Sequence, residues 1–305
     1  MDKYGFFMMK CSGKNIRIIM LELLTCAFPY AAYSQVDSLS RSVNVQASET
    51  KSKTPVHSLY AGAGSGSNMI YLGSSISQNH PFYSASVIYG FRNSIFASVS
   101  TTHITAVNPF NAFYSLSLNY SHTFNSWFDI SSDIAGYKAP QSLQETLFSN
   151  FLFINITAGI DWKLLYTKVS FGGLISENTQ GYLQVRNSRY FETPAFFKGK
   201  CQISFDPNIN MLFGELIKIN SVTGITKYNN PAPFRHLKKN PNGTAVSYTS
   251  KFGLMDFEFS FPVTFSYSNI SFVAEPDYIL PAHTNSDYPA PKGFSFFLNI
   301  YLKII

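Results

Sequence analysis

The connections between candidate strands alternate between short and long from about residue 77 onward. Alternating apolar and polar residues mark the candidate strands, and short joints separate them near 91–93, 123–126, 161–163, 207–210 and 266–269. Long connections fall in between, near 103–111, 137–150, 176–199, 227–251 and 280–292. An up-and-down transmembrane β-barrel has this arrangement, because its strands run back and forth between a rim of short turns and a rim of longer loops.

The alternation within the strands gives each strand one apolar and one polar face, since successive side chains point to opposite sides. The clearest case is 257–266, where five apolar residues alternate with Glu258, Ser260, Pro262, Thr264 and Ser266. The sequence predicts an all-β, antiparallel barrel of about twelve strands, at 68–76, 82–90, 94–102, 112–122, 127–136, 151–160, 164–175, 200–206, 211–226, 252–265, 270–279 and 293–304. Ten or fourteen strands stay open, because 180–191 could add a strand and 211–226 is irregular.

Strand length and aromatic placement favour a membrane barrel over a soluble β-sandwich, although a secreted sandwich used for binding stays an alternative. Most of the segments are close to the roughly 9–11 residues that cross a bilayer at a tilt. Only 13% of the residues are charged and 16% are aromatic, while the mean hydropathy is 0.00. Aromatic residues flank the short turns, as expected of an interfacial girdle: Tyr89, Phe91, Phe124, Trp127, Phe128, Trp162 and Tyr267.

The N-terminal residues predict export. Residues 1–34 combine a basic start, an apolar run and the small residues Ala32 and Ser34, as in a cleaved signal peptide. Residues 35–56 are polar and without period, which predicts a flexible periplasmic lead-in. The barrel domain is expected over 57–305, and no later apolar run is long enough for a spanning helix.

The predicted signal, the aromatic-rich alternation and the closing segment Phe294 to Ile304 together resemble the outer-membrane β-barrel proteins of Bacteroidetes-type bacteria. The resemblance covers roughly residues 57–305. It implies a location in the bacterial outer membrane and a barrel fold. It implies no particular activity and no functional residue.

Catalysis and metal binding have little support in the sequence. The six histidines are scattered without the spacing of a metal site, and neither a metal nor a cofactor is predicted. A barrel enzyme acting on lipid or peptide remains the alternative, with Ser100 and His103, Ser286 and His283, or Asp277 and His283 as conceivable pairs. We therefore expect a protein that is not an enzyme.

Charged residues on the polar faces are the candidate functional residues. Six are predicted to face the lumen, where charges can set ion selectivity: Asp129, Asp133, Lys168, Glu258, Glu275 and Lys303. Their alternative role is mutual pairing inside a narrow barrel. A second candidate is the basic, proline-stiffened outer loop that contains Arg235, His236, Lys238 and Lys239 and could contact anionic lipopolysaccharide.

The function expected from these features is passive: a narrow channel or a structural, surface-exposed barrel. The expected partners are outer-membrane lipid and lipopolysaccharide, and the barrel-assembly machinery during insertion. The formal net charge of +6 is spread thinly and forms no basic stripe, so nucleic-acid binding is not expected. The oligomeric state is left open.

Overall fold

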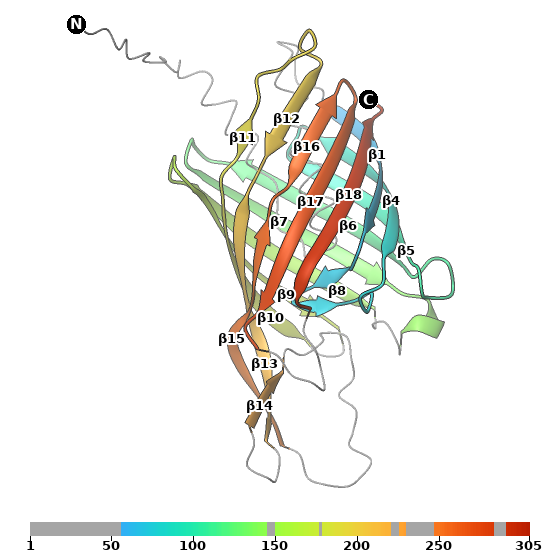
Figure 1. Cartoon of the computed structure of the whole chain (residues 1–305), viewed down its shortest axis with the longest axis vertical. Coiled ribbons are helices and arrows are strands. Elements are labelled where there is room, and N and C mark those ends of the chain that lie inside the picture. The colour runs from blue at the N-terminus through green and yellow to red at the C-terminus, as the bar shows by residue number, and fades with distance from the viewer. Residues whose placement is uncertain (1–55, 145–149, 177–178, 221–225, 230–246, 284–290) are drawn as a thin grey trace, which may run out of the picture.

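The chain forms a closed antiparallel β-barrel of twelve wall strands (Figure 1). The computed structural model describes residues 56–144, 150–176, 179–220, 226–229, 247–283 and 291–305. The wall strands are β1 (His57–Gly66), β4 (Phe82–Phe91), β5 (Ile95–Ile104), β6 (Phe113–Thr123), β7 (Phe128–Lys138), β8 (Phe151–Asp161), β9 (Tyr166–Ile175), β10 (Gln180–Ser188), β13 (Asn208–Asn220), β15 (Ser247–Ser260), β17 (Ile270–Pro281) and β18 (Gly293–Lys303).

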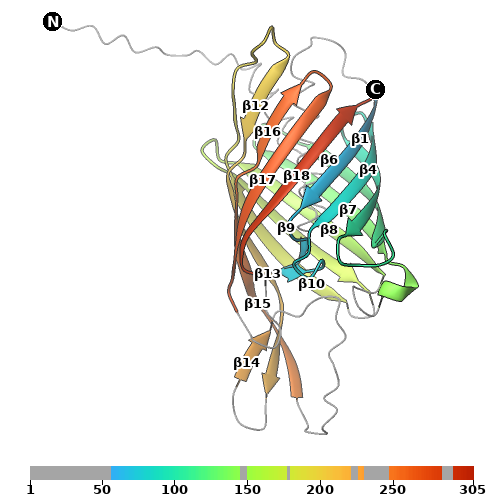
Figure 2. The same ribbon diagram turned by 45° about the vertical axis from the view of Figure 1, so that its right-hand side comes forward.

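Three wall strands are extended by shorter pieces at the short-turn rim. β11 (Phe191–Glu192) follows β10, β12 (Cys201–Phe205) leads into β13, and β16 (Val263–Tyr267) follows β15. The breaks before β13 and before β16 contain Pro207 and Pro262, which have no N–H to donate to the ladder. At the opposite rim β14 (Thr226–Asn229) pairs with β13, and β13 and β15 project beyond the neighbouring strands (Figure 2).

The ring closes where the first wall strand meets the last. β1 pairs with β18 from Tyr60↔Lys303 to Gly66↔Phe297, and the blue and red strands lie side by side in Figure 1. Gly66 has to be small there, because a Cβ on it would lie 2.5 Å from a Phe82 ring atom and 2.6 Å from a Phe297 ring atom. Large rings on the neighbouring strands therefore fill the space above a glycine-rich strand.

The predicted fold class and strand number are confirmed, but three segment assignments were wrong. The Gly-rich segment 57–66 is the first wall strand, whereas 68–76 holds only the small β2–β3 hairpin (Ile70–Tyr71 and Ser74–Ser75). Residues 207–210 are no turn: 200–206 and 211–226 belong to one interrupted wall strand. The segment 180–191 forms the strand β10, which divides the predicted long connection 176–199. The strand number is unchanged, because the strand gained at β10 offsets the one lost when 200–206 and 211–226 become a single strand.

Apolar residues cover the outside of the wall. On β18 the outward side chains are all exposed, from 37% for Phe296 to 70% for Phe294. Rings lie near both rims: Trp127, Trp162 and Tyr267 at the short-turn rim, and Tyr83, Tyr114 and Tyr278 toward the loop rim. An apolar band between two aromatic girdles is the exterior of a transmembrane β-barrel.

Within the described part of the chain, no helix has both the length and the apolar character needed to cross a membrane.

The assignment of faces can be tested with arginine at two adjacent positions of β15. Phe259 is 44% exposed on the outer face and Ser260 is 7% exposed on the lumen face. We expect Phe259→Arg to lower the free energy of unfolding in lipid vesicles by about 2–4 kcal/mol, because its charge enters the hydrocarbon. Ser260→Arg should cost much less, since it lies beside Asp277. Equal costs would contradict the assignment.

The short-turn girdle can be located with the chain's two tryptophans, Trp127 and Trp162. Both are more than half exposed, at 54% and 61%. In single-tryptophan variants (Trp127→Phe or Trp162→Phe) we expect shallow bromines on the lipid chains to quench the fluorescence more than deep ones, because indole rings settle at the interface. Stronger quenching by deep bromines would place this rim inside the hydrocarbon instead.

Candidate functional site

The candidate site is the barrel lumen, whose charged side chains the strand register gathers into one row. Starting from Asp129 on β7, cross-strand pairing leads through Gly159, Lys168 and Arg186 to Asn210 and Glu258 on β15. We call this row of six residues the charged rung. Asp129, Lys168 and Glu258, three of the six predicted lumen residues, therefore lie in one row of cross-strand partners and are at most 6% exposed.

Tyr166 connects the first two charges of the charged rung. Its hydroxyl donates a hydrogen bond of 2.7 Å to the Asp129 carboxylate, and the Lys168 ammonium lies 5.6 Å from the centre of its ring. Gly159 makes this arrangement possible, because a Cβ there would lie 2.5 Å from an Asp129 oxygen. Tyr166 on β9 thus contacts both an anion on β7 and a cation on its own strand.

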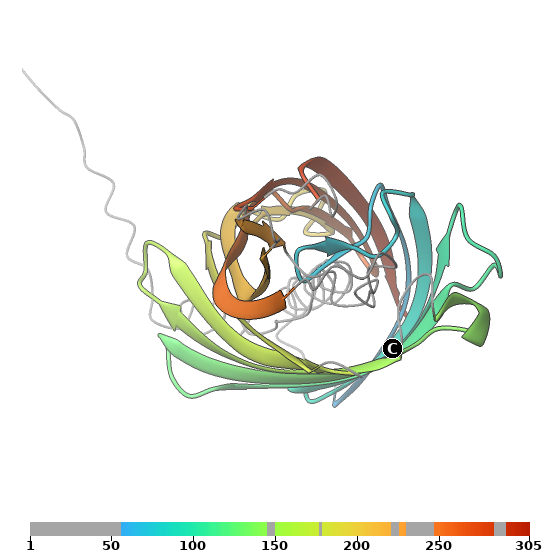
Figure 3. The same cartoon turned by 90° about the horizontal axis from the view of Figure 1, so that it is seen from below.

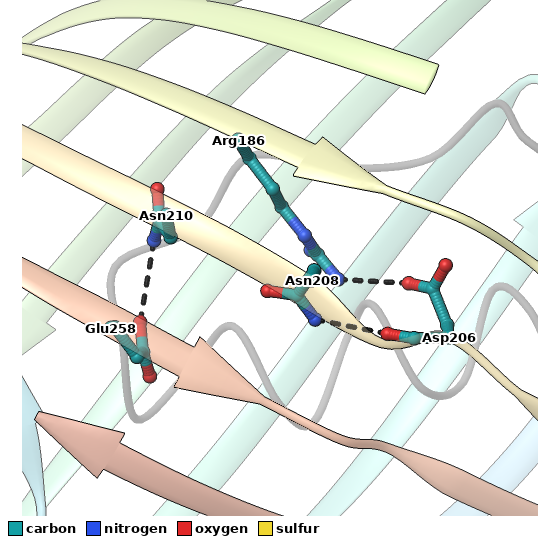
Figure 4. Close-up of polar contacts among 5 residues, drawn as sticks. All are labelled: Arg186, Asp206, Asn208, Asn210 and Glu258. Carbon is teal, nitrogen blue, oxygen red and sulfur yellow. Dashed lines mark hydrogen bonds and ion pairs between the residues drawn. The ribbon is translucent and has the colours of Figure 1, made fainter. Parts of the chain in front are cut away.

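Arg186, in the other half of the charged rung, forms an ion pair with Asp206, which lies just outside the rung (Figure 4). Its Nη2 lies 3.0 Å from Asp206 Oδ2, with only 12% and 3% of the two side chains exposed. Asn210 donates a 3.3 Å hydrogen bond to Glu258, and Asn208 donates one of 3.1 Å to the backbone oxygen of Asp206. Figure 4 shows these side chains, from neighbouring strands, on the same side of the sheet.

The remaining predicted lumen residues lie outside the charged rung. Asp133 is 3% exposed and accepts hydrogen bonds from Asn119 and Asn155. Glu275 and Lys303 are partly buried on the lumen-facing parity of β17 and β18. The predicted basic loop cluster, Arg235, His236, Lys238 and Lys239, lies outside the described residues.

Sequence reasoning missed several lumen charges. Asp206, Asp256 and Asp277 are at most 3% exposed and face the lumen, and Arg186 joins them. The sequence could have identified Asp277, because it lies on the polar side of the alternating segment 270–279. Arg186 was missed because its segment was assigned to a long loop. Among the described residues, six buried lumen carboxylates accompany the cations Lys168 and Arg186. The partly buried Glu275 and Lys303 add one charge of each sign. The lumen wall is therefore acidic in balance.

Among the described residues, no group of three or more His, Cys, Asp or Glu side chains could hold a metal ion. The pair Ser100 and His103, considered for nucleophilic catalysis, does not form. Ser100 faces the lumen and hydrogen-bonds Ser115 at 2.6 Å, while His103 has the opposite parity on β5 and stacks on Phe110 at 4.2 Å. Opposite faces of one strand cannot bring a base to a nucleophile.

The segment between β1 and β4 lies inside the barrel. We call residues 68–79 the inserted hairpin; β2 and β3 pair with each other as a separate sheet. Leu72 and Gly73 at its tip have φ of 44° and 73°, as a type I′ turn requires. Asn68 ties its base together by accepting hydrogen bonds of 2.6 and 2.9 Å from Ser75 and Ser77. Figure 3 looks in from the loop rim and shows this blue segment turned inward.

The inserted hairpin packs into an apolar layer at the loop end of the lumen. Tyr71 is 1% exposed, and its ring makes edge contacts with Tyr137, Phe151 and Phe153 at 5.3 to 6.0 Å. On the wall side the layer consists of Phe82, Ile104, Phe113, Ala135, Tyr137, Phe151, Phe153, Leu174, Tyr182, Leu212, Leu216, Met255, Ile279 and Phe297. Eleven of the twelve wall strands contribute to it.

The hairpin tip reaches the far wall. The carboxylate of Asp256 lies 2.7 Å, and Met255 Cε 3.4 Å, from the place where a Cβ on Gly73 would be. The ladder between β13 and β15 shifts beside this point, and as a result both Met255 and Asp256 are buried. Met255 joins the apolar layer and Asp256 sits next to the tip. The hairpin therefore spans the lumen from the β7–β8 wall to β15.

Comparison with known proteins gives structural neighbours only. No protein-family model and no curated protein matches this sequence. The NanC porin matches 81% of this chain and 100% of its own, with 11% identity and a TM-score of 0.43. The KdgM porin, solved with disordered oligogalacturonate, covers 81% and 98% at 9% identity and a TM-score of 0.42. Omp33 of Acinetobacter baumannii covers 82% and 100% at 8% identity and a TM-score of 0.36.

The contribution of the Arg186–Asp206 pair can be measured by substitution. We expect Arg186→Gln to lower the free energy of unfolding by about 3 kcal/mol, because it leaves a buried carboxylate without its cation. The double variant Arg186→Gln/Asp206→Asn should recover part of this loss. Arg189→Gln is the matched control: Arg189 is exposed on the rim after β10, so its loss should cost less than about 1 kcal/mol. Equal effects at both arginines would contradict a buried pair.

Proposed function

We propose that this protein is a narrow passive channel of the bacterial outer membrane that catalyses no reaction. The observation that supports this proposal is the contrast between the two faces of the wall. Apolar residues and aromatic girdles cover the outside, while Asp129, Lys168, Arg186 and Glu258 face inward in one row of cross-strand partners. Charged side chains that line a lumen are the means by which barrels select ions.

The charge balance of the lumen supports a preference for cations. Glu258 and Asp277 are buried on neighbouring strands. Asp277 pairs with Ser260, two residues along β15 from Glu258. The surplus of carboxylates over Lys168 and Arg186 gives a field that attracts cations and repels anions. Because a ring of acidic side chains is a common cation filter, we propose small cations or cationic solutes as the permeant class.

A structural or surface barrel without transport is the second candidate. The apolar layer favours it, because this layer extends across the loop end of the lumen from eleven wall strands. The two candidates differ in whether current ever flows. A lipid- or peptide-acting enzyme has no comparable arrangement in its favour among the described residues. We further propose outer-membrane lipid, lipopolysaccharide and the barrel-assembly machinery as partners. A Bacteroidetes-type origin is likewise a proposal.

The channel proposal is tested by recording current from refolded residues 35–305 in a planar bilayer over a range of voltages. We expect discrete openings with a reversal potential that favours potassium over chloride in a salt gradient. A correctly folded protein that passes no current at any voltage would contradict a channel and favour the structural barrel.

The selectivity is tested with the double variant Glu258→Gln/Asp277→Asn. Removing two lumen carboxylates should move the reversal potential toward zero, because the field that excludes chloride is weaker. Glu215→Gln is the control, since Glu215 on β13 has the parity opposite to the lumen-facing Leu212 and Leu216 and its loss should leave the reversal potential unchanged. An unchanged potential in the double variant would show that these carboxylates do not select the ions.

A further inference from the structure

We propose that the inserted hairpin, residues 68–79, is a movable gate that closes the loop end of the channel. This inference rests on the channel function proposed above, and it assigns the closing element and the contacts that hold it shut. The gate lies between the outside and the charged rung. Solute selection and closure are therefore carried by different parts of the lumen.

The apolar layer provides the seal. Met69, Ile70, Tyr71, Leu72 and Ile76 are each at most 6% exposed and belong to the same buried cluster as the wall residues. This cluster has members on every wall strand except β1, from which the hairpin itself continues. An apolar constriction stops ions by excluding water. With the hairpin in place, the layer is such a constriction across the whole section.

The hairpin is held by contacts that can break without disturbing the wall. Its two strands form their own sheet and take no part in the barrel ladder. Its fold is maintained internally, since Ile76 N–H donates to the Met69 oxygen at 2.8 Å and the Met69 N–H donates to Ser77 Oγ at 2.8 Å. It can therefore leave the lumen as one unit, while β1 and β4 remain paired along their whole length.

Two anchor points hold the hairpin across the lumen. On one side Tyr71 contacts the rings of Tyr137, Phe151 and Phe153. On the other side Gly73 lies against Asp256 and Met255. The β7–β8 wall and β15 lie almost opposite each other in the strand order. Loss of the Tyr71 ring should release the end that carries most of the apolar contact.

The first test measures access to the lumen, not current. In a Cys201→Ser background, which removes the buried free thiol, Ser98→Cys places a thiol in the lumen on the short-turn side of the apolar layer, where Ser98 is partly exposed. A bulky, impermeant maleimide is added to intact cells. We expect slow labelling with the native hairpin and fast labelling when residues 69–76 are replaced by eight Gly and Ser residues. Equal rates would overturn the gate, whether or not the barrel conducts.

The second test measures openings in a planar bilayer with graded variants. Tyr71→Ala should raise the open probability by roughly tenfold, because three ring contacts are lost. Tyr71→Phe keeps the ring and should behave as the native protein. The same Gly-Ser replacement at residues 193–200, in the hairpin of the other rim, controls for the substitution itself. An unchanged open probability in both Tyr71→Ala and the 69–76 replacement would overturn the gate and leave the channel proposal intact.

The two tests separate failure of the gate from failure of the channel. Fast labelling of Ser98→Cys in the 69–76 replacement without any current would support the hairpin as a plug and contradict the channel. Current in the native protein together with equal labelling rates would support the channel and contradict the gate.

Discussion

The whole structure depends on the pairing of β1 with β18, which closes the sheet into a ring. Inside a bilayer no water is available for free N–H and C=O groups, and an open sheet edge would leave a row of them unsatisfied. The seven aligned pairs between β1 and β18 remove that edge. Because β1 is rich in glycine and alanine, the closure depends on bulky neighbours such as Phe82 and Phe297, whose rings fill the space that β1 leaves empty.

Closure also fixes the register, and the register builds the candidate site. A strand shifted by one residue would turn every lumen side chain toward lipid. In the observed register, Asp129 on β7 and Glu258 on β15 become members of one row although they are far apart in the sequence. The Arg186–Asp206 pair and the Tyr166 contacts then distribute the charges of that row. The proposed selectivity and the fold therefore have the same origin.

The closed ring has an interior that the wall alone does not fill, and the segment after β1 occupies one end of it. The apolar residues of the inserted hairpin find in the lumen the burial that a surface loop could not give them. The layer that they form with eleven wall strands separates the acidic part of the lumen from the loop rim. The proposed selective row and the proposed gate thus occupy different parts of a barrel of only twelve strands.

The sequence by itself determined the barrel class, the strand number and the faces of the regular strands, since period-two alternation depends only on local geometry. It predicted the lumen parity of Asp129 and Glu258, and the rings of Trp127 and Trp162 at the short turns. From the sequence, 57–66 reads only as the start or a bent extension of a first strand at 68–76. Its role as the whole first wall strand depends on β4 and β18, whose side chains cover it. The apolar run at 69–72 was mistaken for a strand, because the same hydrophobicity suits lipid and a sealed lumen. Only the tertiary structure decided which residues face each other across neighbouring strands. That pairing sets the charged rung, the ion pair of Arg186 and the position of the hairpin.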